Sequence, residues 1–140
     1  MTDYVIDANI LVSMLISGKA SYRYLVEHFN FILPDFSLIE IEKYKATILE
    51  KSRLKESQFN QFTYQLFSKL IFLPSLILTN EAKEKAFELT SSIDSKDMAY
   101  VSLSLQLDLI LLTRDKQLVS GLKKKGFRKV MLFEDFLKSI

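Results

Sequence analysis

The stretch Leu109–Leu112 (LILL) is an unbroken apolar run, and Thr113-Arg114-Asp115 follows it directly. Such a run is typical of a strand that is buried on both faces, as in a parallel sheet covered by helices. Residues 3–6 form a second short run with β-branched residues, and Asp7-Ala8-Asn9 comes immediately after it. Both stretches therefore predict a buried strand that ends at an acidic residue.

Helical patterns alternate with short apolar runs along the rest of the chain. Further strands are predicted at residues 31–33, 71–73 and 129–133, and helices at about residues 10–16, 21–29, 35–49, 56–70, 81–89, 94–105, 117–124 and 134–140. Alternation of this kind predicts a three-layer α/β/α fold with a central parallel sheet of about four to five strands. We expect residues 1–140 to form a single domain of this type.

The composition limits the class of protein. Hydrophobic residues make up 49% of the 140 residues, with only 3 Gly and 2 Pro, which favours a packed core over linkers. The net charge of +2 does not by itself indicate a nucleic-acid-binding protein. With no cysteine, no signal-peptide pattern and no apolar stretch of about 20 residues, we expect a cytoplasmic protein without a membrane partner.

Four acidic residues lie beside apolar runs, at Asp7, Glu40, Asp97 and Asp115. In an open α/β sheet, ligands collect outside the carboxyl ends of the strands, where two of these acids are predicted to lie. Carboxylates that lose water and repel one another need a positive charge nearby. Since the set contains no histidine or cysteine, Mg²⁺ or Mn²⁺ suits it best. Metal-assisted cleavage of a phosphodiester is the chemistry that such a site most naturally serves.

Each acid also has a local structural explanation. Asp7 and Asp115 could each be the N-cap of the helix that follows. Glu40 interrupts an apolar helical stripe and could be a boundary residue. Asp97 could be the third position of a capping box that begins at Asp94. The four acids taken together, at strand ends and on inward helix faces, favour the metal site.

The order of four short motifs resembles the PIN domain family. Val5–Leu11 resembles its opening strand and Asp-x-Asn motif, and Ser37–Ile41 resembles its helical Glu motif. Ile93–Ser104 resembles the Asp-x-x-Asp segment with the small-residue helix after it, and Leu111–Asp115 resembles the closing Thr-x-Asp. The order and spacing fit over essentially the whole chain. VapC-type toxins of toxin–antitoxin pairs have the same architecture, size and residue set.

The resemblance implies a metal-dependent ribonuclease that hydrolyses RNA by attack of water. It implies that the cation, Mg²⁺ or Mn²⁺, is held by Asp7, Glu40, Asp97 and Asp115, with Asn9 and Thr113 orienting these carboxylates. The expected protein partners are a small antitoxin protein and a second copy of the chain. The second copy is expected to bind through the middle helices.

Basic residues near the motifs are candidates for phosphate contacts. Lys96 precedes Asp97, and Arg114 precedes Asp115. Exposed basic residues, however, more commonly interact only with solvent. Lys123–Lys125 with Arg128 could follow a nucleic-acid backbone, but cations at a helix C-terminus are the commoner explanation.

Two classes of function remain open from the sequence. The first is an active endoribonuclease, either a toxin masked by a small partner or a housekeeping RNA-processing enzyme. The second is a PIN-like scaffold that binds RNA or protein without cutting it. The presence of all four acids favours the first, because a scaffold has no need to gather carboxylates that repel one another.

Overall fold

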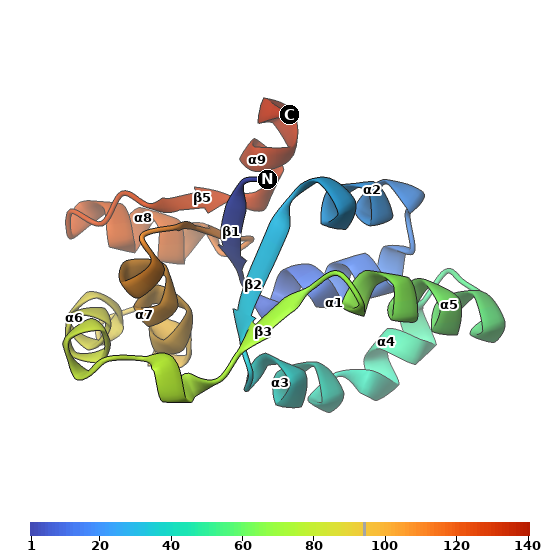
Figure 1. Cartoon of the computed structure of the whole chain (residues 1–140), viewed down its shortest axis with the longest axis horizontal. Coiled ribbons are helices and arrows are strands. Elements are labelled where there is room, and N and C mark those ends of the chain that lie inside the picture. The colour runs from blue at the N-terminus through green and yellow to red at the C-terminus, as the bar shows by residue number, and fades with distance from the viewer. Residues whose placement is uncertain (94) are drawn as a thin grey trace.

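The computed structural model describes residues 1–93 and 95–140. Its described strands form one parallel sheet of five strands in the order β3-β2-β1-β4-β5 (Figure 1). The strands are β1 (Asp3–Ile6), β2 (Asn30–Pro34), β3 (Ile71–Leu73), β4 (Ile110–Thr113) and β5 (Val130–Leu132). The predicted parallel sheet is therefore confirmed, at the upper end of the expected strand number.

Helices lie on both sides of the sheet and complete the predicted three layers. The helices α1 to α5 lie to one side, and α6, α7 and α8 lie to the other (Figure 1). Their bounds are α1 (Ala8–Ser17), α2 (Ala20–His28), α3 (Ser37–Lys43), α4 (Lys45–Lys51), α5 (Glu56–Phe67), α6 (Asn80–Thr90), α7 (Met98–Leu107), α8 (Lys116–Lys124) and α9 (Phe133–Ser139). Short 3₁₀ helices occupy Ser75–Ile77 and Ser95–Asp97.

The long helix predicted over residues 35–49 is wrong, because the chain forms α3 and α4 with a break at Tyr44. Tyr44 has φ −96° and ψ 7°, outside the α-helical range. Its N–H donates to the Ile41 carbonyl (3.0 Å), an i→i−3 bond that tightens the last turn of α3 and ends it. The predicted N-cap at Asp94 lies outside the described residues.

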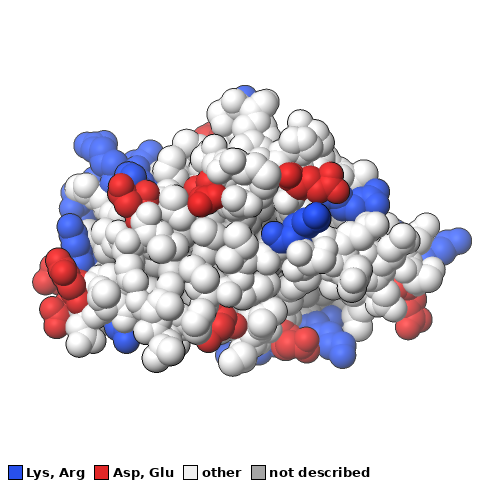
Figure 2. Space-filling view, in the orientation of Figure 1, with Lys and Arg blue, Asp and Glu red and all other residues white. Residues whose placement is uncertain are grey.

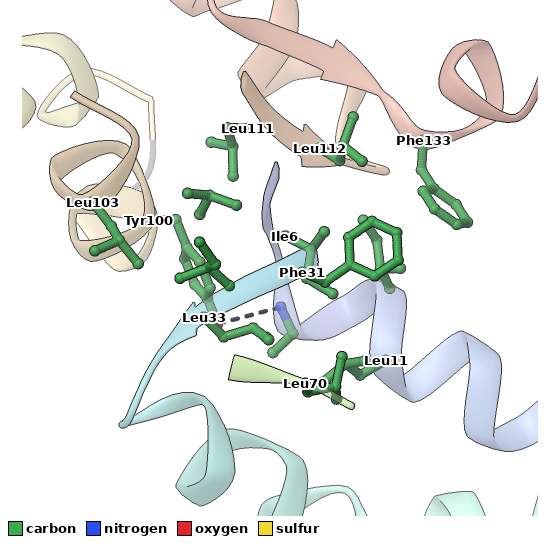
Figure 3. Packing of buried hydrophobic residues seen from close by; sticks show 14 of the residues in the cluster. Ile6, Leu11, Phe31, Leu33, Leu70, Tyr100, Leu103, Leu111, Leu112 and Phe133 are labelled. Carbon is green, nitrogen blue, oxygen red and sulfur yellow. Dashed lines mark hydrogen bonds between the residues drawn. The ribbon is translucent and has the colours of Figure 1, made fainter. Parts of the chain in front are cut away.

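The two central strands are buried on both faces, as their unbroken apolar runs predict. Val5 and Ile6 of β1, and Leu111 and Leu112 of β4, have no exposed surface. Their side chains pack with those of both helical layers (Figure 3). This burial fixes the positions at which β1 and β4 end, and hence the positions of the residues that follow them.

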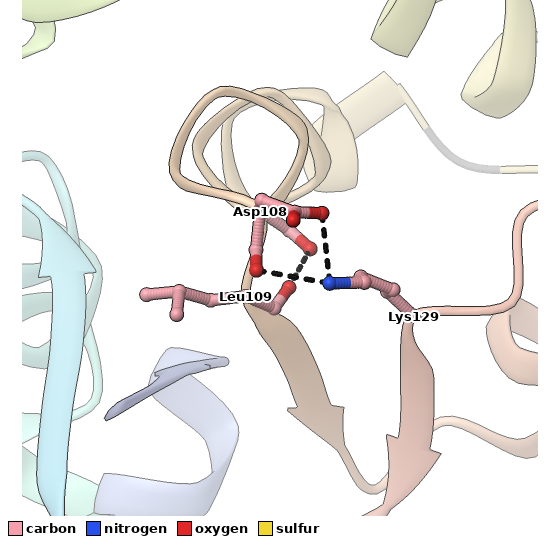
Figure 4. A network of polar contacts seen from close by, with 4 residues as sticks. Asp108, Leu109 and Lys129 are labelled. Atoms are coloured by element: carbon pink, nitrogen blue, oxygen red, sulfur yellow. Dashed lines mark hydrogen bonds and ion pairs between the residues drawn. The ribbon is translucent and has the colours of Figure 1, made fainter. Parts of the chain in front are cut away.

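The turn from α7 into β4 is stabilised by a small polar network (Figure 4). Asp108 lies in the left-handed region (φ 55°), which aspartate tolerates better than most residues. Its carboxylate forms an ion pair with Lys129 Nζ (2.7 Å). The same Nζ donates a hydrogen bond to the Asp108 carbonyl oxygen (3.0 Å). Ser104 Oγ donates to the Leu109 carbonyl in the same network. The network therefore fixes the point at which β4 begins.

Near the same amino-terminal end of the central strands, aromatic side chains hold α9 against the sheet. The Phe136 ring meets Tyr4 edge-on at 4.9 Å between centroids and also contacts Phe29 and Phe31.

Within the described part of the chain, no helix has both the length and the apolar character needed to cross a membrane.

Candidate functional site

Strand register brings the first and last of the four acids to the same edge of the sheet. Ile6 of β1 pairs with Leu112 of β4, so the next residue of each strand, Asp7 and Thr113, fall side by side. The Asp7 N–H extends the ladder by donating to the Leu112 carbonyl (3.1 Å). This edge is the carboxyl end of the parallel strands, where ligands bind in open α/β sheets.

Asp7 is 6% exposed and is the N-cap of α1. Its Oδ1 accepts a hydrogen bond from the Asn9 N–H (3.0 Å), and its Oδ2 accepts one from Thr113 Oγ1 (3.3 Å). Asn9 therefore supports Asp7 through its backbone amide, while its side chain is exposed. The local explanation of Asp7 as a helix cap thus holds alongside its place at the strand end.

Thr113 connects Asp7 to Asp115. The threonine side chain is fully buried, and its Oγ1 accepts the Asp115 N–H (3.1 Å) while donating to Asp7. Asp115 is half-buried and caps α8 through Oδ1, which accepts the N–H groups of Gln117 (3.0 Å) and Leu118 (3.1 Å). Asp115 is thus also a helix cap, with both capping bonds on one carboxylate oxygen.

Glu40 lies in the first turn of α3 and is half-buried. Burial raises the pKa of its carboxyl above the ordinary value, and the negative charge of Asp7 raises it further. The cations Lys43 and Lys96 oppose this shift. The structure therefore brings Glu40 within electrostatic range of Asp7, although the two are separated by more than thirty positions in sequence.

Asp97 is 8% exposed and is the residue at which the 3₁₀ helix gives way to α7. Its side chain makes no capping hydrogen bond to α7, all of whose residues are described. Because the chain turns directly from α7 into β4, the N-terminal end of α7 lies at the carboxyl edge of the sheet. Asp97 is therefore placed at the same edge as Asp7 and Asp115.

Tyr100 belongs to this region and was not among the residues singled out from the sequence. It is 2% exposed, and its hydroxyl accepts the Ala8 N–H (3.3 Å) and shares a hydrogen bond with Ser37 Oγ (2.9 Å). Burial raises the pKa of the phenol well above its ordinary value, and the charges of Asp7 and Glu40 add to the shift. The one sequence signal that could have found it is its position one turn after Asp97 on a helix.

The chemistry of this set suits a hard divalent cation. The candidate ligands are carboxylates, supported by hydroxyl and amide groups, and the repulsion between Asp7 and Glu40 is of the kind that a cation relieves. In the side-chain positions of the described residues, no three acidic, histidine or cysteine groups form a ligand cluster. The fit therefore rests on the donor chemistry and on this repulsion.

The basic residues have different surroundings. Arg114 and Lys96 are exposed beside the acids, and Lys96 also acts on the Glu40 pKa. Lys125 Nζ instead donates to the carbonyls of Glu88 (3.1 Å) and Leu89 (3.2 Å), at the C-terminal end of α6. On the described face shown in Figure 2, acidic and basic side chains are scattered, mostly around the margin.

A groove of about 870 Å³ lies between α3, α4 and α5, away from the four acids. Its walls are mainly apolar and include Ile41, Ile48, Leu54, Phe59 and Phe67. Of the aromatic side chains of α5, Phe59 and Phe67 line this groove and Phe62 is buried, whereas Tyr64 is 77% exposed.

The fold is thus a parallel α/β fold with carboxylates near the carboxyl ends of its two central strands. A family model described as the PIN domain matches residues 5–134, and the chain therefore belongs to the PIN domain family, as the motifs indicated. PIN domains are generally nucleases.

Solved structures that share the fold include the following two. The chain is similar to PAE2754 from Pyrobaculum aerophilum, with a TM-score of 0.67 and 15% identity over 99% of this chain and 94% of that one. It is also similar to VapBC2 from Rickettsia felis, solved bound to a DNA fragment from their promoter, with a TM-score of 0.55 and 17% identity over 93% of this chain and 96% of that one. No curated protein sequence gives a significant match.

Proposed function

We propose that residues 1–140 form one nuclease domain that hydrolyses RNA phosphodiester bonds with the aid of Mg²⁺ or Mn²⁺, as the toxin of a toxin–antitoxin pair. The observation that carries this proposal is the hydrogen-bonded connection from Asp7 through Thr113 to Asp115, with the Glu40 carboxyl in electrostatic range of Asp7. Membership of the PIN family supports the reaction class, and the similarity to VapBC2 supports the toxin role.

Asp7, Glu40, Asp97 and Asp115 are the residues that would hold the cation. When bound, a divalent cation supplies charge neutralisation at the phosphate and a lowered pKa for water. Thr113 orients Asp7 by donating to its Oδ2, and the Asn9 amide fixes the other oxygen. These bonds hold the carboxylate in place before any ligand arrives.

Glu40 would either bind the cation with the other three carboxylates or accept a proton from the attacking water. Its pKa lies above the ordinary glutamate value, because of burial and of Asp7, and this makes it a stronger base than an exposed glutamate. A role as a further ligand uses the same carboxyl group. Lys96 and Arg114, both exposed beside the acids, are proposed to contact the RNA phosphates.

The proposed protein partners are a small antitoxin and a second copy of the chain. Both proposals follow from the similarity to VapBC2 and to the VapC-type toxins. An antitoxin would hold the nuclease inactive until it is released.

A non-cleaving scaffold is the second candidate, and two observations favour it. Asp7 and Asp115 both serve as helix caps, so each has a structural use without any metal. The described side chains also do not gather three ligands into one cluster. A scaffold of this kind would bind RNA or protein through the same fold without hydrolysis.

The test is cleavage of single-stranded and structured RNA in Mn²⁺, Mg²⁺ or chelator. Asp7→Asn removes the charge but keeps a good N-cap residue, so the fold should survive. Asp108→Asn is the matched control, because Asp108 lies at the opposite edge of the sheet and asparagine tolerates its left-handed conformation. We expect metal-dependent cutting that Asp7→Asn abolishes and Asp108→Asn retains. RNA binding without cutting in either metal would support the scaffold instead.

A further inference from the structure

One buried hydroxyl touches the chain beside two of the proposed ligands. Tyr100 Oη accepts the N–H of Ala8, the residue directly after Asp7, at 3.3 Å. It also shares a 2.9 Å hydrogen bond with Ser37 Oγ, at the start of α3 and one turn before Glu40. Tyr100 itself lies one turn after Asp97 on α7.

The bond to Ala8 completes the N-terminus of α1. The first N–H groups of a helix have no partner within the helix. Asp7 Oδ1 accepts the N–H of Asn9, and Tyr100 Oη accepts the N–H of Ala8, which is buried away from water. Without the tyrosine hydroxyl, that N–H would lose its acceptor inside the protein, and the start of α1 would be less firmly held.

The tyrosine ring is fixed independently of its hydroxyl. It is 2% exposed and meets Phe36 edge-on, with the ring centroids 5.3 Å apart and the planes at 61°. Phe36 is the N-cap residue of α3. The ring and the hydroxyl of Tyr100 therefore both connect α7 to the start of α3.

A neutral hydroxyl is well suited to this position. Burial and the charges of Asp7 and Glu40 keep the phenol protonated, so Tyr100 can donate one hydrogen bond while it accepts another. A cation in its place would neutralise the carboxylates and compete with a metal ion, whereas a hydroxyl leaves their charge intact.

We propose that Tyr100 is a positioning residue, whose hydroxyl holds the three elements that carry Asp7, Glu40 and Asp97 at the spacing needed to bind a divalent cation. This inference rests on the proposed function. It assigns to Tyr100 no contact with the RNA or with the cation.

The test is Mn²⁺ binding to the whole protein without RNA, measured by electron paramagnetic resonance of free Mn²⁺. Tyr100→Phe removes only the hydroxyl and keeps the packed ring. Tyr4→Phe is the matched control, since Tyr4 is also packed among aromatic rings and its hydroxyl makes no hydrogen bond to the described residues. We expect Tyr100→Phe to weaken Mn²⁺ binding about tenfold, as loss of a residue supporting metal ligands commonly does, and Tyr4→Phe to leave it unchanged.

A second readout separates positioning from a loss of folded protein. In RNA cleavage, the Mn²⁺ concentration for half-maximal rate should rise by the same factor in Tyr100→Phe, and excess Mn²⁺ should restore most of the rate. Ser37→Ala, which removes the hydroxyl partner, should shift the Mn²⁺ dependence in the same direction and serves as the test if Tyr100→Phe does not fold.

Mn²⁺ affinity within twofold of wild type, in Tyr100→Phe or in the Ser37→Ala substitute, would overturn the positioning role and leave the nuclease proposal standing. A wild-type protein that binds no Mn²⁺ would overturn the proposed function and this inference with it.

Discussion

Replacing Thr113 with valine keeps the shape of a fully buried side chain and removes only its hydroxyl. That hydroxyl donates to Asp7 Oδ2 (3.3 Å) and accepts the Asp115 N–H (3.1 Å). Thr113→Val therefore breaks both bonds of the connection between the two strand-end acids. The substitution tests whether this connection contributes to the stability of the folded protein.

The loss can be estimated from the two bonds. A hydrogen bond to a charged group contributes about 1.5 kcal/mol at the low end of its range, which suits the long contact to Asp7. The Asp115 N–H loses its acceptor at a cost of about 1 kcal/mol, at the low end because Asp115 is half-buried and water can reach it. We therefore expect Thr113→Val to lower the free energy of unfolding by about 2.5 kcal/mol.

Thr113→Ser is the control, since it keeps the hydroxyl and loses one buried methyl group, worth about 1 kcal/mol. Both variants are compared with wild type by urea denaturation in chelator, so that bound metal adds nothing to stability. The expected order of stability is wild type, then serine, then valine. A valine variant as stable as the serine variant would show that the hydrogen bonds contribute little, and the reasoning would be refuted.

Three further changes test other features of the structure. Lys125→Met should lower the free energy of unfolding by about 1–2 kcal/mol, because it removes hydrogen bonds to carbonyls at the C-terminal end of α6. The control is Lys124→Met, a change at an exposed lysine that should have little effect in the same urea assay. Equal effects of the two substitutions would mean that the Lys125 contact is not stabilising. Since folding raises the Glu40 pKa above its ordinary value of 4.5, the folded protein holds that proton more tightly than the unfolded chain, and stability should fall as pH rises through the folded pKa. Glu40→Gln cannot ionise, so its urea midpoint should gain on that of wild type as pH rises, and parallel pH profiles would rule out the raised pKa. Gly18→Ala should be destabilised by about 2 kcal/mol in a thermal or urea melt, because Gly18 has φ 62° and a Cβ would approach Leu54 Cγ to 2.6 Å; a neutral effect would mean that Leu54 moves aside easily.

The sheet could be predicted from the sequence because its central strands are buried on both faces. Burial of this kind requires an unbroken apolar run, and Leu109–Leu112 carries that pattern whatever lies around it. The break between α3 and α4 could not be predicted in the same way. The apolar stripe continues through Tyr44 to Ile48, so the side-chain period gives no sign that the backbone leaves the helix at Tyr44.

In the candidate site, too, some residues could be predicted from the sequence and others could not. Asp7 and Asp115 could be located because Asp7 directly follows β1 and Asp115 follows β4 after one residue, which is a local property of the sequence. Tyr100 could not, because its hydroxyl meets groups that are 92 and 63 positions away in the chain. A buried tyrosine on an apolar helix face has the sequence pattern of an ordinary core residue, and only the fold shows where its oxygen lies.

Hydrogen bonds from neutral groups hold Asp7 and the backbone beside it in place. Asp7 accepts hydrogen bonds from a backbone amide and from the Thr113 hydroxyl, and Tyr100 fixes the neighbouring backbone through another hydroxyl. Such donors stabilise a carboxylate through directed hydrogen bonds. Burial raises the pKa of Glu40, and repulsion from Asp7 raises it further. A bound divalent cation would remove that repulsion. Relief of the repulsion would therefore make the free energy of cation binding more favourable.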